Sequence, residues 1–239
     1  MELRDAAAIV TGASRGLGAA LARRLAAEGA RVVLVARGAE ELTRVADQIR
    51  AAGGEAHALA ADVGDKDAVH AIAGAAAALV GPVDLLVHNA STLGPTPLRL
   101  LLDTECEDLE QVLAVNLVGP FRLTKVVAGS MVLRGRGTVV HVTSDAATSA
   151  YPRWGAYGVS KAALEHLGRI WAAELEGSGV RVVTFDPGEM DTQMHRDAIP
   201  DADPATLADP AEVAARLLAQ LRGGGVAGAA PRGREEALS

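Results

Sequence analysis

A tyrosine and a lysine stand four residues apart in the segment Tyr157-Gly158-Val159-Ser160-Lys161. Two side chains at this spacing share one face of a helix. A free phenol ionises near pH ~10 and exchanges protons poorly at neutral pH. An ammonium group close by favours the phenolate and typically lowers its pKa by about 1–3. The pair therefore predicts a tyrosine that works as a general acid and base, with a chance pairing on an ordinary helix as the alternative.

The overall composition narrows the classes of function. The 239 residues carry a formal charge of −7, which argues against broad nucleic-acid binding, because that needs a basic face. Cys106 is the single cysteine, so no intrachain disulfide can form. No apolar run reaches the ~18–20 residues of a membrane span, and two acidic residues near the N-terminus do not suit a signal peptide. We therefore expect a cytoplasmic chain with no metal site and neither a membrane nor a nucleic-acid partner.

The N-terminal segment has the pattern of a dinucleotide-binding unit. Residues 6–10 are wholly apolar and predict a buried strand, residues 11–18 are rich in glycine, residues 19–27 predict a helix, and residues 31–36 predict a second buried strand. Glycines at 12, 16 and 18 permit a tight turn and a close approach of phosphate to the helix N-terminus. Their spacing is G-x-x-x-G-x-G, and the alternative is a turn that merely requires glycine.

Arginine follows the second strand, where an NAD-preferring enzyme usually has an acidic residue for the ribose hydroxyls. Ala36 occupies the acidic position, Arg37 comes next, and Arg15 lies in the first turn. Two guanidinium groups suit a 2′-phosphate, so the pattern favours NADP(H). Two alternatives remain: both arginines are solvated surface groups, or the enzyme prefers NAD and Arg37 is idle.

Further strands alternate with helices along the chain. The expected strands are 56–61, 83–87, 137–142 and 180–185; the expected helices are 40–51, 66–79, 107–131 (one long helix or two abutting ones), 157–176 and 210–221. Residues 189–209 read as a loop with at most a short helix. This alternation predicts an α/β fold, a three-layer doubly wound parallel sheet with strand order 3-2-1-4-5-6. We expect one domain over 1–222 and an irregular Gly/Ala-rich tail over 223–239, with a seventh strand weak or absent.

Polar and special residues follow the strand ends, where such sheets bind ligands. Asn89, Ser144 and Pro187 come directly or closely after the fourth, fifth and sixth strands, and we expect them to converge with the glycine-rich turn. Asp62 follows the third strand and suits either an adenine amino group or a cap on the next helix. Asn116 lies in an apolar helix, where a buried amide needs partners, and the alternative to a functional role is bonding to backbone in the core.

These motifs together resemble the short-chain dehydrogenase/reductase family, in its compact, NADP-preferring branch. The resemblance covers roughly residues 3–221. The matching motifs occur in the order typical of the family: Thr11-Gly12-x-x-x-Gly16-x-Gly18, Asp62-Val63, Asn89-Ala90, Asn116, Ser144, Tyr157-x-x-x-Lys161 and Pro187-Gly188-x-x-x-Thr192. The interval of 13 residues between Ser144 and Tyr157 is also typical of it.

The resemblance implies roles for four catalytic residues. Tyr157 would exchange a proton with the substrate oxygen, and Lys161 would lower the pKa of Tyr157 and bind the nicotinamide ribose. Ser144 would hold the carbonyl oxygen, and Asn116 would anchor a water that links Lys161 to solvent. The implied cofactor-binding residues are Gly12, Ser14, Arg15, Gly16, Leu17, Gly18, Arg37, Asp62, Val63, Asn89, Ala90, Tyr157, Lys161, Pro187, Gly188, Met190 and Thr192.

The substrate side is apolar in the sequence. Leu93, Tyr151, Trp154, Met190 and Met194 are expected to line the pocket, beside Ser144 and Tyr157. They predict a small to medium, fairly hydrophobic ketone or aldehyde, or the matching alcohol. The alternative is that Tyr151 and Trp154 simply pack their loop.

Two departures from the family pattern stand out. The motif Asn-Asn-Ala-Gly reads His88-Asn89-Ala90-Ser91, and His88 is interpreted mainly as a packing variant. The weak seventh strand makes a homodimer, through the helices that carry Asn116 and Tyr157, a safer expectation than a homotetramer. The sequence thus favours an NADP(H)-dependent oxidoreductase, with a non-catalytic dinucleotide-binding sensor or partner-binding protein as the alternative.

Overall fold

Six parallel strands form the centre of the computed structural model, which describes residues 1–223. The strands are β1 (Ala7–Thr11), β2 (Arg31–Ala36), β3 (Glu55–Ala60), β4 (Leu85–His88), β5 (Gly137–Val142) and β6 (Val180–Phe185). Their order across the sheet is β3-β2-β1-β4-β5-β6, which confirms the expected topology. The possible seventh strand and residues 224–239 of the expected tail lie outside the described residues, while Gly223 closes the last helix.

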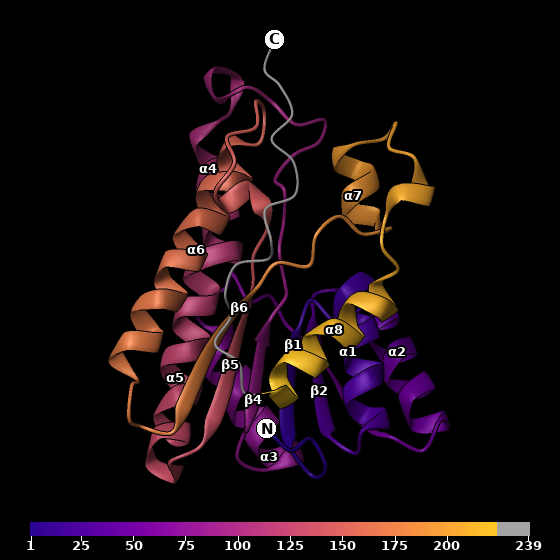
Figure 1. Cartoon of the computed structure of the whole chain (residues 1–239), viewed down its shortest axis with the longest axis vertical. Helices are drawn as coiled ribbons and strands as arrows, with labels where there is room; N and C mark the ends of the chain where they lie inside the picture. The colour runs from indigo at the N-terminus through magenta and orange to yellow at the C-terminus, as the bar shows by residue number, and fades with distance from the viewer. Residues whose placement is uncertain (224–239) are drawn as a thin grey trace.

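Helices connect the strands and cover both faces of the sheet (Figure 1). They are α1 (Gly16–Ala27), α2 (Ala39–Ala51), α3 (Ala68–Val80), α4 (Cys106–Leu113), α5 (Gly119–Arg134), α6 (Gly155–Glu174), α7 (Gln193–Ala198) and α8 (Pro210–Gly223). Short 3₁₀ turns are η1 (Leu101–Asp103), η3 (Asp145–Ala147) and η4 (Pro204–Thr206). The segment over 189–209 therefore holds one short helix and one turn.

The apolar strands supply both faces of the sheet with core residues. Along β1, Ala8 and Val10 belong to the cluster formed with α1, α2 and α8, whereas Ala7 and Ile9 belong to the cluster formed with α3 and α5. Alternate residues of a strand point to opposite faces, so a wholly apolar run can serve two helical layers at once. This is why the run reads as a continuous apolar segment and why the fold has three layers.

A single continuous helix spans Cys106–Arg134, because a π-helical segment, η2 (Ala114–Val118), joins α4 to α5. By length and composition this helix could cross a membrane, with a mean hydropathy of 1.3 in its most apolar window. It packs against α3 and α6 and contacts the sheet, so it is a core helix of this fold. π-Helical segments are uncommon and concentrate at functional sites, and this one carries Asn116.

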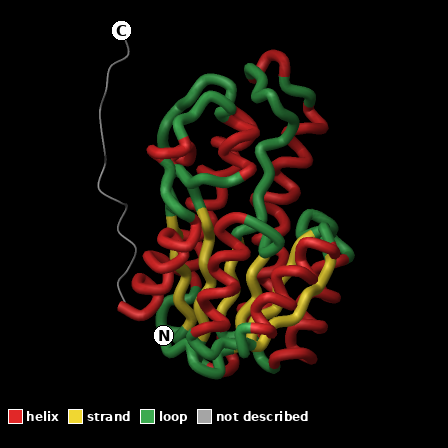
Figure 2. The backbone as a smooth tube through the Cα atoms, turned by 90° about the vertical axis from the view of Figure 1, so that its right-hand side faces the viewer, coloured by secondary structure: helices red, strands yellow, loops and turns green. Residues whose placement is uncertain are grey.

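Loops and short helices extend beyond one end of the sheet (Figure 2). The segments after β4, β5 and β6 all lie at this end, where α4, the start of α6 and α7 are also found (Figure 1). The carboxyl ends of parallel strands necessarily share one edge, so the residues singled out in the sequence gather there.

Candidate active site

Tyr157 and Lys161 lie in the first two turns of α6 and are both buried. The ammonium nitrogen of Lys161 lies 5.5 Å from the centre of the Tyr157 ring and donates a hydrogen bond of 2.8 Å to the carbonyl oxygen of Val142. The lysine is therefore held by the end of β5 and sits over the face of the tyrosine ring. The spacing in the sequence places the two side chains together, as expected for one helix face.

The pKa of Tyr157 moves opposite to the prediction from that spacing. Burial raises the pKa of Tyr157 to about 12, against smaller lowering effects from the hydroxyls of Ser144 and Ser91. Burial also lowers the pKa of Lys161 to about 8, an effect that Asp186 opposes. Because the cation faces the ring and not the hydroxyl, desolvation outweighs its attraction for the phenolate in this arrangement. Hydroxyl groups, and not the lysine, favour the ionised tyrosine here.

Ser144 follows β5 and begins the turn η3. Its hydroxyl accepts a hydrogen bond from the backbone N–H of Ala146 at 3.2 Å and donates one to Asp145 at 3.0 Å. A serine in this capping position is held by the turn it closes, so its hydroxyl has a defined direction. The same hydroxyl acts on the phenol of Tyr157, which brings together two of the predicted catalytic residues.

Asn116 is buried in η2, and both the oxygen and the nitrogen of its side-chain amide are bonded to protein atoms. Its oxygen accepts from the N–H of Thr92 at 2.8 Å, and its nitrogen donates to the carbonyl of Thr92 and to the hydroxyl of Ser160, both at 2.9 Å. Ser160 in turn donates to the carbonyl of Tyr157 at 2.6 Å. The amide thus ties the loop after β4 to α6.

The glycine-rich turn after β1 packs directly against the segment after β4. The amide nitrogen of Asn89 donates to the carbonyls of Thr11 (3.0 Å) and Gly12 (3.1 Å). A β-carbon on Gly12 would come within 2.8 Å of the Ala90 Cα, and one on Gly18 would overlap the Gly12 carbonyl oxygen. Close backbone packing therefore requires these glycines, and Asn89 holds the turn in place.

The start of α1 suits a phosphate group. The residue before the helix, Arg15, makes no side-chain cap, so the first N–H groups of α1 keep no partner from that side chain. Gly16 has a φ of +54°, a conformation that favours glycine, and its nearest neighbour is the Thr192 methyl group. Leu17 is buried and anchors the helix, and Ser14 is half-buried. The cradle fits a pyrophosphate.

Two arginines border this cradle. Arg15 and Arg37 are both exposed, and neither forms an ion pair within residues 1–223. Arg37 directly follows β2, at the same edge of the sheet as the cradle. Their guanidinium groups remain available for an anion, which is what a 2′-phosphate requires.

Asp62 closes a turn and does not cap the following helix. Its carboxylate accepts from the N–H of Gly64 at 2.8 Å, whereas α3 begins after Asp67, which makes no side-chain cap. Val63 is buried, and its carbonyl oxygen lies so close to Gly119 that a β-carbon there would overlap it. The capping interpretation of Asp62 is therefore not observed, and its role toward adenine stays a prediction.

The segment after β6 is held in place by its own hydrogen bonds. Thr192 caps α7 through a hydrogen bond from the N–H of His195 at 3.3 Å, and Gly188 has a φ of +71°. The carbonyl of Pro187 accepts from Arg216 in α8 at 2.5 Å. Met190 packs against the core cluster on the α1 and α8 side, and not against Tyr157.

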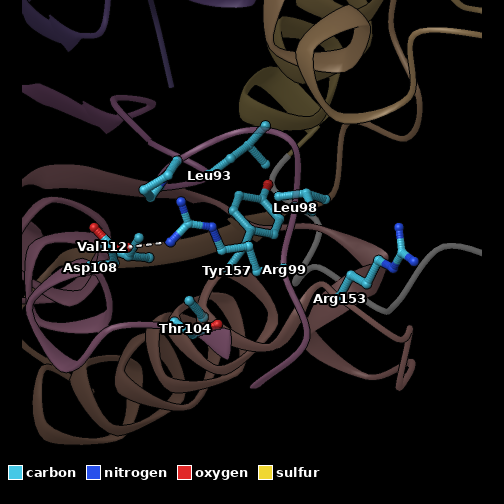
Figure 3. Close-up of a pocket in the computed structure, with 11 residues that line it drawn as sticks. Leu93, Leu98, Arg99, Thr104, Asp108, Val112, Arg153 and Tyr157 are labelled. Carbon is cyan, nitrogen blue, oxygen red and sulfur yellow. Dashed lines mark ion pairs between the residues drawn. The ribbon is translucent and has the colours of Figure 1, made fainter. Parts of the chain in front are cut away.

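A cavity lies beside Tyr157 (Figure 3). Its lining comprises Leu93, Gly94, Pro95, Leu98, Arg99, Thr104, Asp108, Val112, Arg153, Ala156 and Tyr157. Arg99 pairs with Asp108 at 3.8 Å inside it, and Arg153 points away from its centre (Figure 3). The sequence predicted few fixed charges at this site, so the ion pair is a correction. The sequence did not indicate this ion pair, because Arg99 and Asp108 both lie outside the recognised motifs.

The predicted substrate residues separate into two groups. Trp154 contacts Tyr157 edge to face with ring centres 5.7 Å apart, and Met194 packs on the cluster of Leu93, Ala146 and Tyr157. Tyr151 is 46% exposed and donates to Asp145 at 2.9 Å, away from the cavity lining. The structure therefore brings Trp154 and Met194 to the tyrosine and leaves Tyr151 on the loop surface.

Comparison with known proteins gives one consistent family. The model for short chain dehydrogenase matches residues 6–203. A short chain dehydrogenase of Pseudocercospora fijiensis is 40% identical over 198 residues, which cover 81% of this chain and 62% of that protein, less than two thirds of its length. Galactitol 2-dehydrogenase (L-tagatose-forming) of Cereibacter sphaeroides is 40% identical over 194 residues, covering 80% of this chain and 74% of that protein. A metagenomic short-chain oxidoreductase in complex with NADP matches with a TM-score of 0.79 and 35% identity, covering 92% of both chains.

Proposed function

The chain belongs to the short-chain dehydrogenase/reductase family of oxidoreductases, and we propose that it interconverts a ketone or aldehyde and its alcohol with NADP(H). Tyr157 is the general acid and base in this proposal. The observation that carries it is the buried phenol of Tyr157, bordered by the Ser144 hydroxyl and the Lys161 ammonium at the same sheet edge as the glycine cradle.

The cofactor binds along that edge. The glycine turn and the start of α1 hold the pyrophosphate, Arg15 and Arg37 hold the 2′-phosphate, and the segment from Pro187 to Thr192 holds the nicotinamide amide. Asn89 keeps the turn in shape. The structurally related oxidoreductase that binds NADP supports the choice of cofactor. When bound, the reduced nicotinamide supplies the hydride that adds to the carbonyl carbon.

The chain itself supplies and recovers the proton. In reduction, the Tyr157 hydroxyl gives its proton to the carbonyl oxygen, which becomes the alcohol, and Tyr157 is left as a phenolate until a proton returns. In oxidation, the phenolate accepts the alcohol proton. Ser144 orients the substrate oxygen, and Lys161 provides a positive charge within the buried site. A phenol whose pKa burial raises to about 12 needs these groups to release its proton.

The first test is Tyr157→Phe. This variant removes only the hydroxyl, so we expect turnover to fall by about 10²–10⁴-fold, the usual contribution of a positioned acid–base group. NADPH binding, measured by fluorescence enhancement, should change less than about threefold. Equal loss of turnover and cofactor binding would show that the residue is structural, and full retention of turnover would refute the mechanism.

The substrate proposal is a small to medium carbonyl compound with an apolar part that packs on Leu93, Leu98 and Trp154. A second candidate class is the polyols, which the Arg99–Asp108 ion pair in the cavity favours because both groups bind hydroxyls. Galactitol 2-dehydrogenase, 40% identical, is named for such a substrate. Rates with NADPH and a panel of apolar ketones, against rates with NADP⁺ and a panel of sugar alcohols, distinguish the two classes.

A cytoplasmic homodimer is the proposed form of the enzyme. Apolar side chains of α5 and α6 are exposed, with Leu133 at 90% and Val159 at 54%. Phe121 and Trp171 stack across these two helices with ring centres 6.0 Å apart. These helices carry or adjoin the site residues, so a dimer would bury the exposed apolar side chains. Sedimentation equilibrium tests this, and a monomer at micromolar concentration would refute it.

A further inference from the structure

Ser91 carries a buried hydroxyl that nothing in the proposed mechanism uses. It lies three residues beyond the end of β4, at the position where the resembled family motif has glycine. Its Oγ is closed off from solvent and makes no hydrogen bond within residues 1–223. Folded proteins keep few such groups, because an unpaired buried hydroxyl carries a free-energy penalty. The hydroxyl therefore points to a partner that appears during the reaction.

The backbone on both sides of Ser91 is fixed by other elements. Before it, the Thr11 hydroxyl accepts from the N–H groups of Asn89 (3.1 Å) and Ala90 (3.0 Å). After it, Asn116 holds both the N–H and the carbonyl of Thr92, at 2.8 and 2.9 Å. β1 and the π-helical segment thus fix the peptide from two directions. The Ser91 side chain is preorganised, which is what a hydrogen bond made only in a charged state requires.

The loop that carries Ser91 is tied to the Tyr157 turn of α6. Asn116 accepts from the N–H of Thr92 at 2.8 Å and donates to Ser160 at 2.9 Å. Ser160 donates to the carbonyl oxygen of Tyr157 at 2.6 Å, so the Ser91 hydroxyl lies on the side of this tyrosine.

Two hydroxyls act on the phenol of Tyr157 and lower its pKa against the effect of burial: Ser144 and Ser91. They follow the ends of the adjacent strands β5 and β4, where His88 is in register with His141. Asp145 and Asp186 act in the opposite direction, and Lys161 lies over the ring.

The two serines differ in what else they bind. The Ser144 hydroxyl is already bonded to Asp145 and to the N–H of Ala146, and it also has to orient a substrate oxygen in the proposed function. The Ser91 hydroxyl has no other partner among the described residues. A hydroxyl free of other partners can turn its hydrogen fully toward a developing negative charge.

We propose that Ser91 donates a hydrogen bond to the Tyr157 oxygen when the phenol has lost its proton, and so shares with Ser144 the stabilisation of the phenolate. The inference rests on the proposed function, because only a Tyr157 that ionises during the reaction needs this donor. Ser144 then serves mainly the substrate oxygen, and Ser91 serves the tyrosine alone.

The ionisation of Tyr157 can be observed directly, because the chain contains only Tyr151 and Tyr157. With ¹³Cζ-labelled tyrosine, two resonances report their ionisation, and Tyr151→Phe assigns them. In the NADPH complex, Ser91→Ala should delay ionisation of Tyr157 by about one pH unit, since one charged hydrogen bond is worth about that much. Circular dichroism at each pH value confirms that the chain remains folded.

Kinetics provide the second measurement. Alcohol oxidation requires the phenolate, so its pH profile in Ser91→Ala should move upward by about one pH unit, with kcat about tenfold lower at pH 8. KM and the NADPH Kd should stay within about twofold. Ser91→Thr keeps the hydroxyl and should restore most of the rate.

Ser149→Ala is the matched control. Ser149 is exposed, and its hydroxyl acts on the other tyrosine: it opposes the groups that raise the pKa of Tyr151, among them Asp145. This variant should change only the Tyr151 resonance and leave the pH profile of turnover in place. A Ser91→Ala variant that changes both resonances would indicate a general disturbance and count against the proposal.

The outcomes separate the two proposals. If Ser91→Ala leaves the Tyr157 ionisation and the pH profile unchanged while Tyr157→Phe abolishes turnover, the role of Ser91 is refuted and the proposed function stands. If Ser91→Ala weakens only NADPH binding, its hydroxyl serves the cofactor and the inference is also wrong. If Tyr157→Phe remains active, the proposed function itself fails, whatever Ser91 does.

Discussion

The half of the site proposed for the cofactor and the half proposed for the substrate are built in different ways. Around the cradle, backbone packs on backbone: Gly12 lies against Ala90, and Gly18 lies against the Gly12 carbonyl. The Asn89 side chain donates to the carbonyls of Thr11 and Gly12. Around the cavity, side chains from separate loops meet, as Arg99 meets Asp108 and Trp154 meets Tyr157. A backbone contact tolerates few residue types, whereas a side-chain contact can be made by many. The first half therefore leaves a sequence signature and the second does not.

The largest effect is expected from a pair of glycine variants, one in each half. In Gly18→Ala the new methyl group would overlap the Gly12 carbonyl, a backbone atom held by Asn89. In Gly155→Ala it would meet only the end of the Leu101 side chain, which is exposed and can move. We expect NADPH affinity to fall at least about 100-fold in the first variant and less than about threefold in the second. NADPH affinity is measured by fluorescence titration. Similar losses of affinity in the two variants would contradict the proposed difference between the two halves.

We expect the protein to lose stability in acid, because His141 is buried in β5. Burial, with a smaller effect from the nearby Lys161, lowers the pKa of His141 from its usual 6.5 to about 4. The unfolded chain binds the proton first, so this stability is fully present above pH 6.5 and is lost as pH falls toward 4. The loss is roughly 3 kcal/mol.

His141→Leu isolates this contribution. It fills the core position with an apolar side chain and removes the titrating group. The fall in unfolding free energy between pH 6.5 and 4 should therefore be smaller in the variant by roughly 3 kcal/mol. His88, whose pKa is also lowered by burial, still contributes in the variant. Urea unfolding at several pH values measures the difference. An unchanged pH dependence would show that His141 does not titrate in this range.

A smaller effect is expected from Arg37→Ala. Loss of one guanidinium should weaken NADPH binding by about tenfold to fiftyfold and leave NADH binding nearly unchanged, because only NADPH carries the 2′-phosphate. The control is Arg169→Ala, an exposed arginine on α6 paired with Glu165, which should affect neither cofactor. Equal losses of NADPH and NADH binding would show that Arg37 does not bind the 2′-phosphate and would favour the NAD-preferring alternative.

The sequence predicted the secondary-structure elements and the motifs more accurately than the chemistry of the site residues. The bounds of β5 and β6 agree with prediction residue for residue, because apolar runs closed by glycine or polar residues leave few options. The direction of the Tyr157 pKa was wrong, because spacing shows that Lys161 is near but not that it sits over the ring, bonded to Val142. Asn116 was recognised as unusual, yet its partners, Thr92 and Ser160, depend on a chain crossing that no local pattern encodes.

Periodic apolar runs, obligatory glycines and the Tyr157–Lys161 interval were enough to determine the α/β class, the strand order and the edge of the sheet where the predicted site residues gather. Each of these follows from local backbone geometry, which is written in consecutive residues. Only the tertiary structure decided how deeply Tyr157 is buried, which hydroxyls reach it, and that charges enter the neighbouring cavity. Those properties depend on the desolvation and direction of side chains brought together from distant segments, and they set the chemistry.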